Sequence, residues 1–496
     1  MSEVKTLAKE TAVYGLSSIL GKFLNWCLVP LYTYKLATSA DYGIVTNMYA
    51  WTAFCLVILT YGMETGLFRF VNDEKENPDN VYGTILTTVL GTSLLFAVGV
   101  SLMSPGIASW LGYAAHPEYI VMMAVTVSVD AVAAIPFAHL RYRKKSMAFA
   151  MLKFAFVLLN ITFNLFFLVL CPYLMKVCPA AVDWFYRPDY GVGYVFLANL
   201  ISTILQTSFL LPLLGLRKFR YDVALLRRVL RYSLPLLLLG VVGIINQTVD
   251  KMLMPFLYGS QELGQAQLGI YGACFKVAMV MMMFTQAFRY AYEPYVFAKN
   301  KDADSRQAYA DTMKFFIITS LFIFLGMMAY LDILKYIIRE DYWEGLNIVP
   351  VILVSYIFQG IYFNLSMWYK LIDRTYFGAL MSLVGCIIDV GLIIVLVPRI
   401  GYMGAAVAAL CAYFCIMLLS YFLGQKYMPV PYALKEILRY SLLAGVLYAV
   451  IACLKTPSVL LNYAINTLAV LAYLVYMVKT DLPLGSLPVI GKYFKK

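Results

Sequence analysis

Fourteen apolar stretches, each long enough to cross a bilayer, constrain the fold of this chain more than any other feature. None alternates polar and apolar residues as a half-buried strand does, and each is too long for a strand. A membrane-spanning helix needs about 20 apolar residues, so every stretch predicts one such helix. The predicted helices cover 11–36, 42–70, 82–103, 118–140, 146–170, 190–214, 229–258, 269–297, 309–330, 344–368, 376–398, 402–424, 436–454 and 459–478.

The composition agrees with an all-α polytopic membrane protein. Of 496 residues, 62% are hydrophobic and only 13% are charged, whereas soluble proteins carry about 25% charged residues. Such a chain lacks the polar surface that a water-soluble multidomain enzyme needs. Its 40 tyrosines and 31 phenylalanines also exclude a disordered or fibrous chain. No small-residue cleavage motif follows the mixed-charge start, so we expect no cleavable signal peptide.

The basic excess of the chain predicts its orientation in the membrane. The 39 lysines and arginines outnumber the 27 acidic residues, and their positions follow the predicted helices. The segments on the side of the N-terminus hold 26 of these cations, and the opposite loops hold 7. Short cytoplasmic loops are rich in Lys and Arg, so we expect both termini in the cytoplasm. We assign this charge to topology and lipid headgroups rather than to nucleic acid.

An internal repeat divides the predicted helices into two sets of six. Segments 225–229 residues apart resemble one another, and Pro30 aligns with Pro255 and Glu64 with Glu293. Six is an even number, so both sets enter the membrane in the same direction, as in parallel-repeat transporters. The paired segments are GKFLNWCLVPLY (21–32) with NQTVDKMLMPFLY (246–258), YGIVTN (42–47) with LGIYGA (268–273), and GMETGLFRF (62–70) with AYEPYVFAK (291–299).

The repeat predicts three parts of the chain. Residues 1–215 form an N-terminal lobe of helices 1–6, and residues 216–424 form a C-terminal lobe of helices 7–12. Residues 425–496 hold helices 13 and 14 and a cytoplasmic tail.

Several segments together resemble the oligosaccharide flippases, which export O-antigen and capsule repeat units, of the multidrug/oligosaccharidyl-lipid/polysaccharide exporter superfamily. The resemblance covers essentially the whole chain, although no single motif is diagnostic. The segments are YGLSSILGKFLNWCLVPLYTY (14–34), YGMETGLFRF (61–70), IPFAHLRYRKK (135–145), YSLPLLLLG (232–240), PRIGYMGAAVAA (398–409) and GQKYMPVPY (424–432).

This resemblance implies a function and its partners. Such proteins move an undecaprenyl-diphosphate-linked oligosaccharide from the inner to the outer leaflet by alternating access, often through a cationic cavity and often coupled to H+ or Na+. The polysaccharide polymerase machinery is a candidate partner, and no other cofactor is implied. Relatives commonly carry Asn nine residues before the proline of the 398–409 segment, whereas this chain carries Asp389. That departure leaves the coupling ion open.

Ionisable residues at membrane depth are the candidate site residues, because each costs about 3 kcal/mol at a helix centre and is usually kept for a cavity or a partner. Lys22 lies near the midplane by the helical rise, and Asn25 and Trp26 share its face. Together with Lys276 they are candidates for binding a diphosphate and sugars. The alternative is that Lys22 pairs with a carboxylate or extends to the interface.

A second group of charges is a candidate cytoplasmic gate. Arg289 and Glu293 are four residues apart on one helix, and Glu64 and Arg69 lie at the matching depth of another. In the closed state we expect Glu64 to pair with Arg289 and Glu293 with Arg69. The alternative is that all four are solvated charges at the membrane interface.

Two acids at equal depth in the C-terminal lobe form a candidate ion-coupling site. Asp250 and Asp389 each lie about 12–13 Å from the outer ends of their helices, and Asn246 lies one turn before Asp250. Carboxylate and amide oxygens suit Na+, and a single carboxylate can instead carry a proton. The alternative is that Asp250 pairs with Lys251 or with another lysine.

Other functions fit the sequence less well. A multidrug or organic cation antiporter of the same superfamily would use an acidic, aromatic cavity, which Lys22 and Lys276 disfavour. A membrane polymerase, ligase or acyltransferase would need catalytic residues in a sizeable outer loop. The longest outer loop, 171–189, is short and lacks histidine, so we expect neither an enzyme nor a metal centre. Whether Cys171 and Cys178 of that loop form a disulfide is left open.

Overall fold

The computed structural model describes residues 21–24, 26–213, 221–299, 305–454 and 456–481, and the regular secondary structure of this part is entirely helical. Thirteen helices in this part are long and apolar enough to cross a membrane, and each matches a predicted stretch. The first ten residues of the first predicted helix, 11–36, and its Asn25 lie outside the described residues, and α2 (Leu28–Lys35) forms its C-terminal part. The all-α membrane fold is therefore confirmed, and the count of fourteen stays a prediction.

The chain divides into two compact units. The first unit is Met1–Ala273 with Ser382–Ala408, and the second is Cys274–Met381 with Ala409–Lys496. This division rests on contacts between residues, whereas the predicted division rests on the sequence repeat. The predicted N-terminal lobe (1–215), C-terminal lobe (216–424) and C-terminal part (425–496) therefore remain a prediction.

The first unit contains α2 and the helices that follow it as far as the start of α12, together with most of α17. Its members are α3 (Ser39–Thr60), α4 (Met63–Val71), α5 (Pro78–Leu102), α6 (Ser104–Leu111), α7 (Pro117–Tyr142), α8 (Ser146–Leu165), α9 (Cys171–Val177), α10 (Gly191–Leu210), α11 (Val223–Leu253), the start of α12 (Gln261–Lys299) and most of α17 (Tyr376–Ile400). Both Cys171 and Cys178 are free thiols.

The second unit contains the rest of α12 and most of the remaining helices. These are α13 (Ser305–Ala329), α14 (Leu331–Leu334), α15 (Val349–Leu365), α16 (Met367–Leu371), most of α18 (Tyr402–Tyr427), α19 (Leu434–Cys453) and α20 (Val459–Thr480). Short 3-10 turns link several helices, the longest being Glu340–Ile348.

The second predicted helix, 42–70, is broken into α3 and α4. Thr38 starts α3 because its hydroxyl accepts from the Asp41 amide while the Asp41 carboxylate accepts from the Thr38 amide. The break lies at Tyr61 and Gly62, whose φ angles are 29° and 72°. Glycine adopts positive φ without a Cβ penalty. A Cβ at Gly62 would also lie 2.9 Å from the Ser233 carbonyl oxygen of α11, so α4 packs closely on α11 here.

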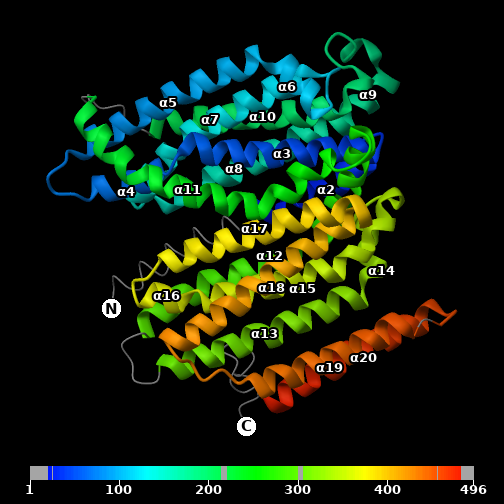
Figure 1. Ribbon diagram of the computed structural model, residues 1–496. Helices are drawn as coiled ribbons and strands as arrows, with labels where there is room; N and C mark the ends of the chain where they lie inside the picture. The colour runs from blue at the N-terminus through cyan, green and yellow to red at the C-terminus, as the bar shows by residue number, and fades with distance from the viewer. Residues whose placement is uncertain (1–20, 25, 214–220, 300–304, 455, 482–496) are drawn as a thin grey trace. The chain divides into compact units, whose positions relative to one another are not determined.

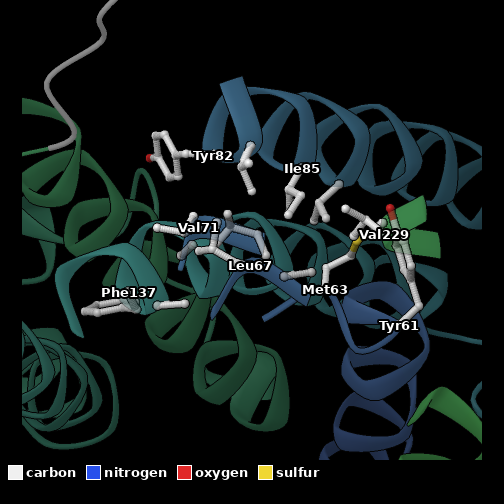
Figure 2. Packing of buried hydrophobic residues seen from close by; sticks show 14 of the residues in the cluster. Tyr61, Met63, Leu67, Val71, Tyr82, Ile85, Phe137 and Val229 are labelled. Atoms are coloured by element: carbon white, nitrogen blue, oxygen red, sulfur yellow. The ribbon is translucent and has the colours of Figure 1, made fainter. Parts of the chain in front are cut away.

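A buried apolar cluster packs α4 against its neighbouring helices in the first unit. Met63, Leu67 and Val71 of α4 face Tyr82 and Ile85 of α5 (Figure 2). Phe137 of α7 and Val229 of α11 complete the same cluster. Apolar spacing of three and four residues puts the α4 side chains on one face, which explains why so short a helix packs firmly.

In the second unit, α19 and α20 form a hairpin (Figure 1) that packs against α13. The Lys314 ammonium of α13 donates to Glu436 Oε2 of α19 at 2.7 Å and to Asp481 Oδ1 at 2.9 Å. The hydroxyl of Tyr440, a fully buried residue of α19, donates to Asp481 Oδ2 at 2.6 Å. One cation therefore fastens both helices of the hairpin to α13.

Candidate functional site

Two buried acids from helices far apart in the sequence lie close together in the first unit. Asp250 is in α11 and Asp389 is in α17, and their exposed fractions are 8% and 5%. Their charges interact with each other and with that of Lys251. The two acids predicted at equal depth are thus brought together, while their role in ion coupling stays a prediction.

Asp250 has strong partners of its own. The Lys251 ammonium lies 2.8 and 3.0 Å from the two carboxylate oxygens, and the Tyr271 hydroxyl donates to Oδ2 at 2.7 Å. The pairing of Asp250 with Lys251, which the sequence left open as an alternative, is therefore present. Tyr271 of α12 was not predicted, because the rotation of α12 about its axis is invisible in an apolar sequence.

Asp389 is less well compensated than Asp250. Its Oδ1 atom is buried and has no hydrogen-bond partner among the residues that the structure describes. The Asn246 side-chain amide donates instead to the Ser382 carbonyl oxygen at 2.9 Å, so Asn246 ties α11 to α17 rather than serving Asp389. A buried polar atom without a partner is costly, and binding a proton is the simplest way for a carboxylate to reduce that cost.

Whether the predicted site binds Na+ stays a prediction, and the carboxylate oxygens are the groups that bear on it. No group of three or more acidic, His or Cys side chains in the described part of the chain could hold a metal ion. The Asp250 oxygens are already engaged by Lys251 and Tyr271. Na+ would need several oxygens at once, whereas a proton needs only the unpartnered oxygen of Asp389.

The predicted substrate-binding residues fall in different units. Lys22 and Trp26 belong to the first unit, where Trp26 stacks on Phe23 with ring centroids 5.8 Å apart. Asn25 lies outside the described residues. Lys276 belongs to the second unit, and its ammonium lies 3.9 Å from the Met279 sulfur. Both lysines are half-buried, and their role as cargo contacts stays a prediction.

In the first unit, the candidate gate residues have partners within the unit. The Arg141 guanidinium donates to Glu64 Oε2 at 2.6 Å. The Arg69 guanidinium lies 4.3 Å from the centroid of the Tyr232 ring. The sequence assigned Arg141 to a topology-setting cluster only. The proposed pairing of Glu64 with Arg289 stays a prediction.

In the second unit, Glu293 bonds two cations. Lys370 donates to Glu293 Oε1 at 2.8 Å and Arg289 donates to the same oxygen at 3.1 Å. Burial alone would raise the pKa of the Glu293 carboxyl, but these bonds and charges outweigh it and hold the pKa below its ordinary value. The carboxylate is therefore charged at neutral pH. Its predicted pairing with Arg69 is untested.

A chain of buried polar groups next to the acids was not predicted. The Gln265 amide of α12 donates to the Tyr113 hydroxyl at 2.9 Å, and that hydroxyl donates to Asn47 Oδ1 of α3 at 2.6 Å. The Asn47 amide then donates to the Lys251 carbonyl oxygen at 2.7 Å. The only signal in the sequence was that Asn47 ends one of the repeated segments.

The second unit contains a cavity of about 820 Å³. Helices α13, α15, α18 and α19 line it almost entirely with apolar side chains, among them Ile317, Val354 and Ala444. Gly445 of α19 also lines it, and a Cβ there would meet nothing within 4 Å. A cavity lined almost entirely by apolar side chains suits an apolar ligand.

Comparison with known proteins adds a family. The family described as "Polysaccharide biosynthesis protein" matches residues 35–347 of the chain. No curated protein matches the chain.

Solved structures share the fold at low sequence identity. The lipid II flippase MurJ in an inward closed conformation superposes with a TM-score of 0.73 at 16% identity, covering 95% of this chain and 98% of that one. An inward-facing multidrug resistance MATE transporter of the MOP superfamily gives 0.64 at 13% identity, over 85% and 95% of the chains. A MOP superfamily transporter from Pyrococcus furiosus gives 0.56 at 15% identity, over 84% and 95%. At such identities the likeness shows the fold alone.

Proposed function

Because the matched region is more than half of its length, the chain belongs to the polysaccharide biosynthesis protein family, and from this premise we propose that it is a lipid-linked oligosaccharide flippase. Its cargo is an undecaprenyl-diphosphate-linked repeat unit, moved from the inner to the outer leaflet of the cytoplasmic membrane by alternating access. The resemblance to the oligosaccharide flippase family is confirmed by the family match and by the shared fold.

The apolar cavity of the second unit is the observation that carries the proposal. A cargo with a long polyisoprenyl chain needs an apolar space next to the path of its polar head, and the lining of this cavity suits such a chain. A free sugar or a small hydrophilic solute would gain nothing from it. The half-buried cations Lys22 and Lys276 suit the diphosphate, which binds cations through charge-assisted hydrogen bonds.

Coupling to H+ completes the proposed mechanism. Asp389 carries the proton, because its buried Oδ1 atom has no hydrogen-bond partner among the described residues, while Asp250 is already compensated by Lys251 and Tyr271. Loading Asp389 with a proton removes its repulsion with Asp250. The solved structures that share the fold are a flippase and a transporter. We therefore propose transport for this chain rather than an enzymatic reaction.

A strain that lacks the gene tests the substrate. We expect undecaprenyl-linked oligosaccharide to accumulate in the inner leaflet and one surface glycan, such as an O-antigen or a capsule, to disappear. Loss of drug resistance with intact surface glycan would instead establish the multidrug antiporter. A change in neither would contradict both functions.

The cavity itself is tested by filling it. Gly445→Trp places an indole in the cavity without a backbone clash, so we expect transport of the lipid-linked oligosaccharide in vesicles to fall at least tenfold. Gly91→Trp is the matched control, because Gly91 of α5 is exposed and a Cβ there also meets nothing within 4 Å. Equal transport by both variants would rule out the cavity as part of the cargo path.

A further inference from the structure

The ammonium of Lys251 is surrounded by groups that bind cations. Its Nζ atom lies 3.0 and 2.8 Å from the two carboxylate oxygens of Asp250 and 3.5 Å from the carbonyl oxygen of Gln247. The centroid of the Tyr271 ring is 5.7 Å from the same nitrogen. Carboxylate and carbonyl oxygens are the ligands that hard cations take in proteins. The first unit therefore holds one of its own side chains among the ligands of a cation.

Lys251 reaches Asp250 although the two residues are adjacent in α11. Adjacent residues of a helix point about 100° apart and do not face each other, whereas residues three or four apart do. A long lysine side chain at such a position can extend instead to water or to the lipid headgroups. The side chains of Lys251 and Asp250 are only 13% and 11% exposed, so the lysine bends back to its neighbour. The acid, rather than the geometry of the helix, sets the place of the ammonium.

The frame around the pair is fixed by two further helices. The Asn47 side-chain amide of α3 donates to the Lys251 carbonyl oxygen at 2.7 Å. The Tyr271 hydroxyl of α12 donates to Asp250 Oδ2 at 2.7 Å. Asn47 and Tyr271 are 1% and 0% exposed. Neither bond involves the lysine side chain, so a change confined to that side chain leaves the frame in place.

A second acid shares the same ammonium. Asp389 of α17 lies near enough for its charge to interact with those of Asp250 and Lys251. It is 5% exposed, and its Oδ1 atom has no hydrogen-bond partner in the part of the chain that the structure describes. Removing one partner of a buried ion pair leaves an uncompensated charge and is strongly unfavourable. Without the ammonium, the two acids would therefore need another cation.

We propose that Lys251 is a tethered cation, which occupies the cation site of the two acids and thereby excludes Na+ from it. Lys251 is then the residue that determines which ion the site accepts. In the proposed function, on which this inference rests for its role in transport, the two acids are the coupling site. Without the lysine side chain, the site takes a free monovalent cation that prefers oxygen ligands, and Na+ is the probe.

A tethered ammonium excludes a free cation for two physical reasons. It carries the same charge as Na+, so binding Na+ beside it would place two cations together in a site shielded from water. It also engages both Asp250 oxygens, which a free ion would need as ligands. Because the ammonium is part of the chain, its effective concentration at the site is high and independent of the salt outside. Removing the side chain reverses these effects and leaves space for an ion.

The effect of Na+ on the thermal stability of the purified full-length protein tests the proposal. A ligand that binds only the folded state raises the apparent unfolding temperature. In Lys251→Met we expect Na+ to raise this temperature by at least about 3 °C relative to choline at the same ionic strength. The wild-type protein should unfold at the same temperature in both salts. Lys251→Arg keeps a tethered cation and should behave as the wild type does.

Lys335→Met is the matched control. Lys335 also forms an ion pair with a carboxylate, that of Asp332 at 3.1 Å, but the Asp332 side chain is 64% exposed. Water solvates that carboxylate once the lysine is removed, so Na+ and choline should give the same unfolding temperature. In Lys251→Met/Asp250→Asn the Na+ effect should disappear, because the neutral amide no longer attracts a cation.

Two results would overturn the tethered cation: an equal response of Lys251→Met to Na+ and choline, or stabilisation of the wild-type protein by Na+. If Lys251→Met does not fold in either salt, Lys251→Gln decides by the same measurement, since its amide still donates to Asp250 but carries no charge.

This readout needs no cargo and therefore separates the inference from the proposed function. Stabilisation of Lys251→Met by Na+, in a protein whose wild-type vesicles do not transport the oligosaccharide, would overturn only the proposed function. Transport by the wild-type protein, with no Na+ effect in Lys251→Met, would overturn only the tethered cation.

Discussion

The acids at membrane depth were identified from the sequence, but most of their partners were not. The helical rise placed Asp250 and Asp389 at equal depth, and the structure brings them together. Lys251 was available as a partner one residue away, whereas Tyr271 and Arg141 come from distant parts of the chain. A depth is a local property of one helix, but a partner depends on how two helices are rotated toward each other.

Asp389 carries the first residue-scale prediction. Asp389→Asn keeps the shape of the side chain but cannot exchange a proton, so we expect transport to lose its response to a pH gradient. In wild-type vesicles a gradient of one pH unit supplies about 1.4 kcal/mol per proton, which corresponds to a tenfold bias. The measurement is the transport rate with and without the gradient, in the presence and absence of Na+.

The matched control is Asp332→Asn, since Asp332 is exposed and forms an ion pair with Lys335, three residues further along the chain. This control should keep the full response to the gradient. A response to pH that survives in Asp389→Asn, or a response to Na+ alone, would contradict H+ coupling at this residue.

A helix can end at residues whose backbone conformation cannot be recognised from the pattern of apolar residues. The predicted 42–70 helix is broken because Tyr61 and Gly62 adopt positive φ, so α4 turns away from α3 and packs on α11. The sequence does contain the glycine, but a single glycine in an apolar stretch is more often tolerated within a helix. The structure shows the break through the positive φ angles of Tyr61 and Gly62 and the close approach of Ser233 to Gly62.

The α19–α20 hairpin carries the prediction at the scale of elements. Burial alone would raise the pKa of the Asp481 carboxyl, but the hydrogen bonds from Tyr440 and Lys314 outweigh it and hold that pKa below its ordinary value. A carboxyl with a depressed pKa stabilises the fold fully above its ordinary pKa of 3.8, and this contribution is lost as pH falls below that value. Asp481→Asn removes the same contribution at every pH.

We therefore expect Asp481→Asn to raise amide hydrogen exchange in the last turn of α20 several-fold at neutral pH, while the wild-type protein shows this only below about pH 4. Asp311→Asn is the control, because Asp311 is exposed on α13 and accepts a hydrogen bond from Gln307 of its own helix. Equal exchange in Asp481→Asn and Asp311→Asn would show that the Lys314 contacts do not anchor the hairpin.

The orientation of the whole molecule follows from charges that lie outside the helices. The positive-inside distribution predicts that the loop containing Glu74 is cytoplasmic and that the loop containing Cys178 is outside. A membrane-impermeant thiol reagent on intact cells should label Cys178, which is exposed, but not Glu74→Cys. Labelling of Glu74→Cys should appear only after the membrane is permeabilised. The reverse pattern would invert the predicted topology.

The sequence by itself determined the fold class, the positions of the membrane helices and the family resemblance, because hydrophobic length is a property of one segment at a time. It also identified the repeat, though not what the repeated segments do. Only the tertiary structure decided that Gly43 lies against Gly269, that Asp389 has an oxygen without a partner among the described residues, and that α13, α15, α18 and α19 line an apolar cavity. Helices that are apolar on every side leave their rotation and their neighbours open, and those are set by contacts between segments distant in the sequence.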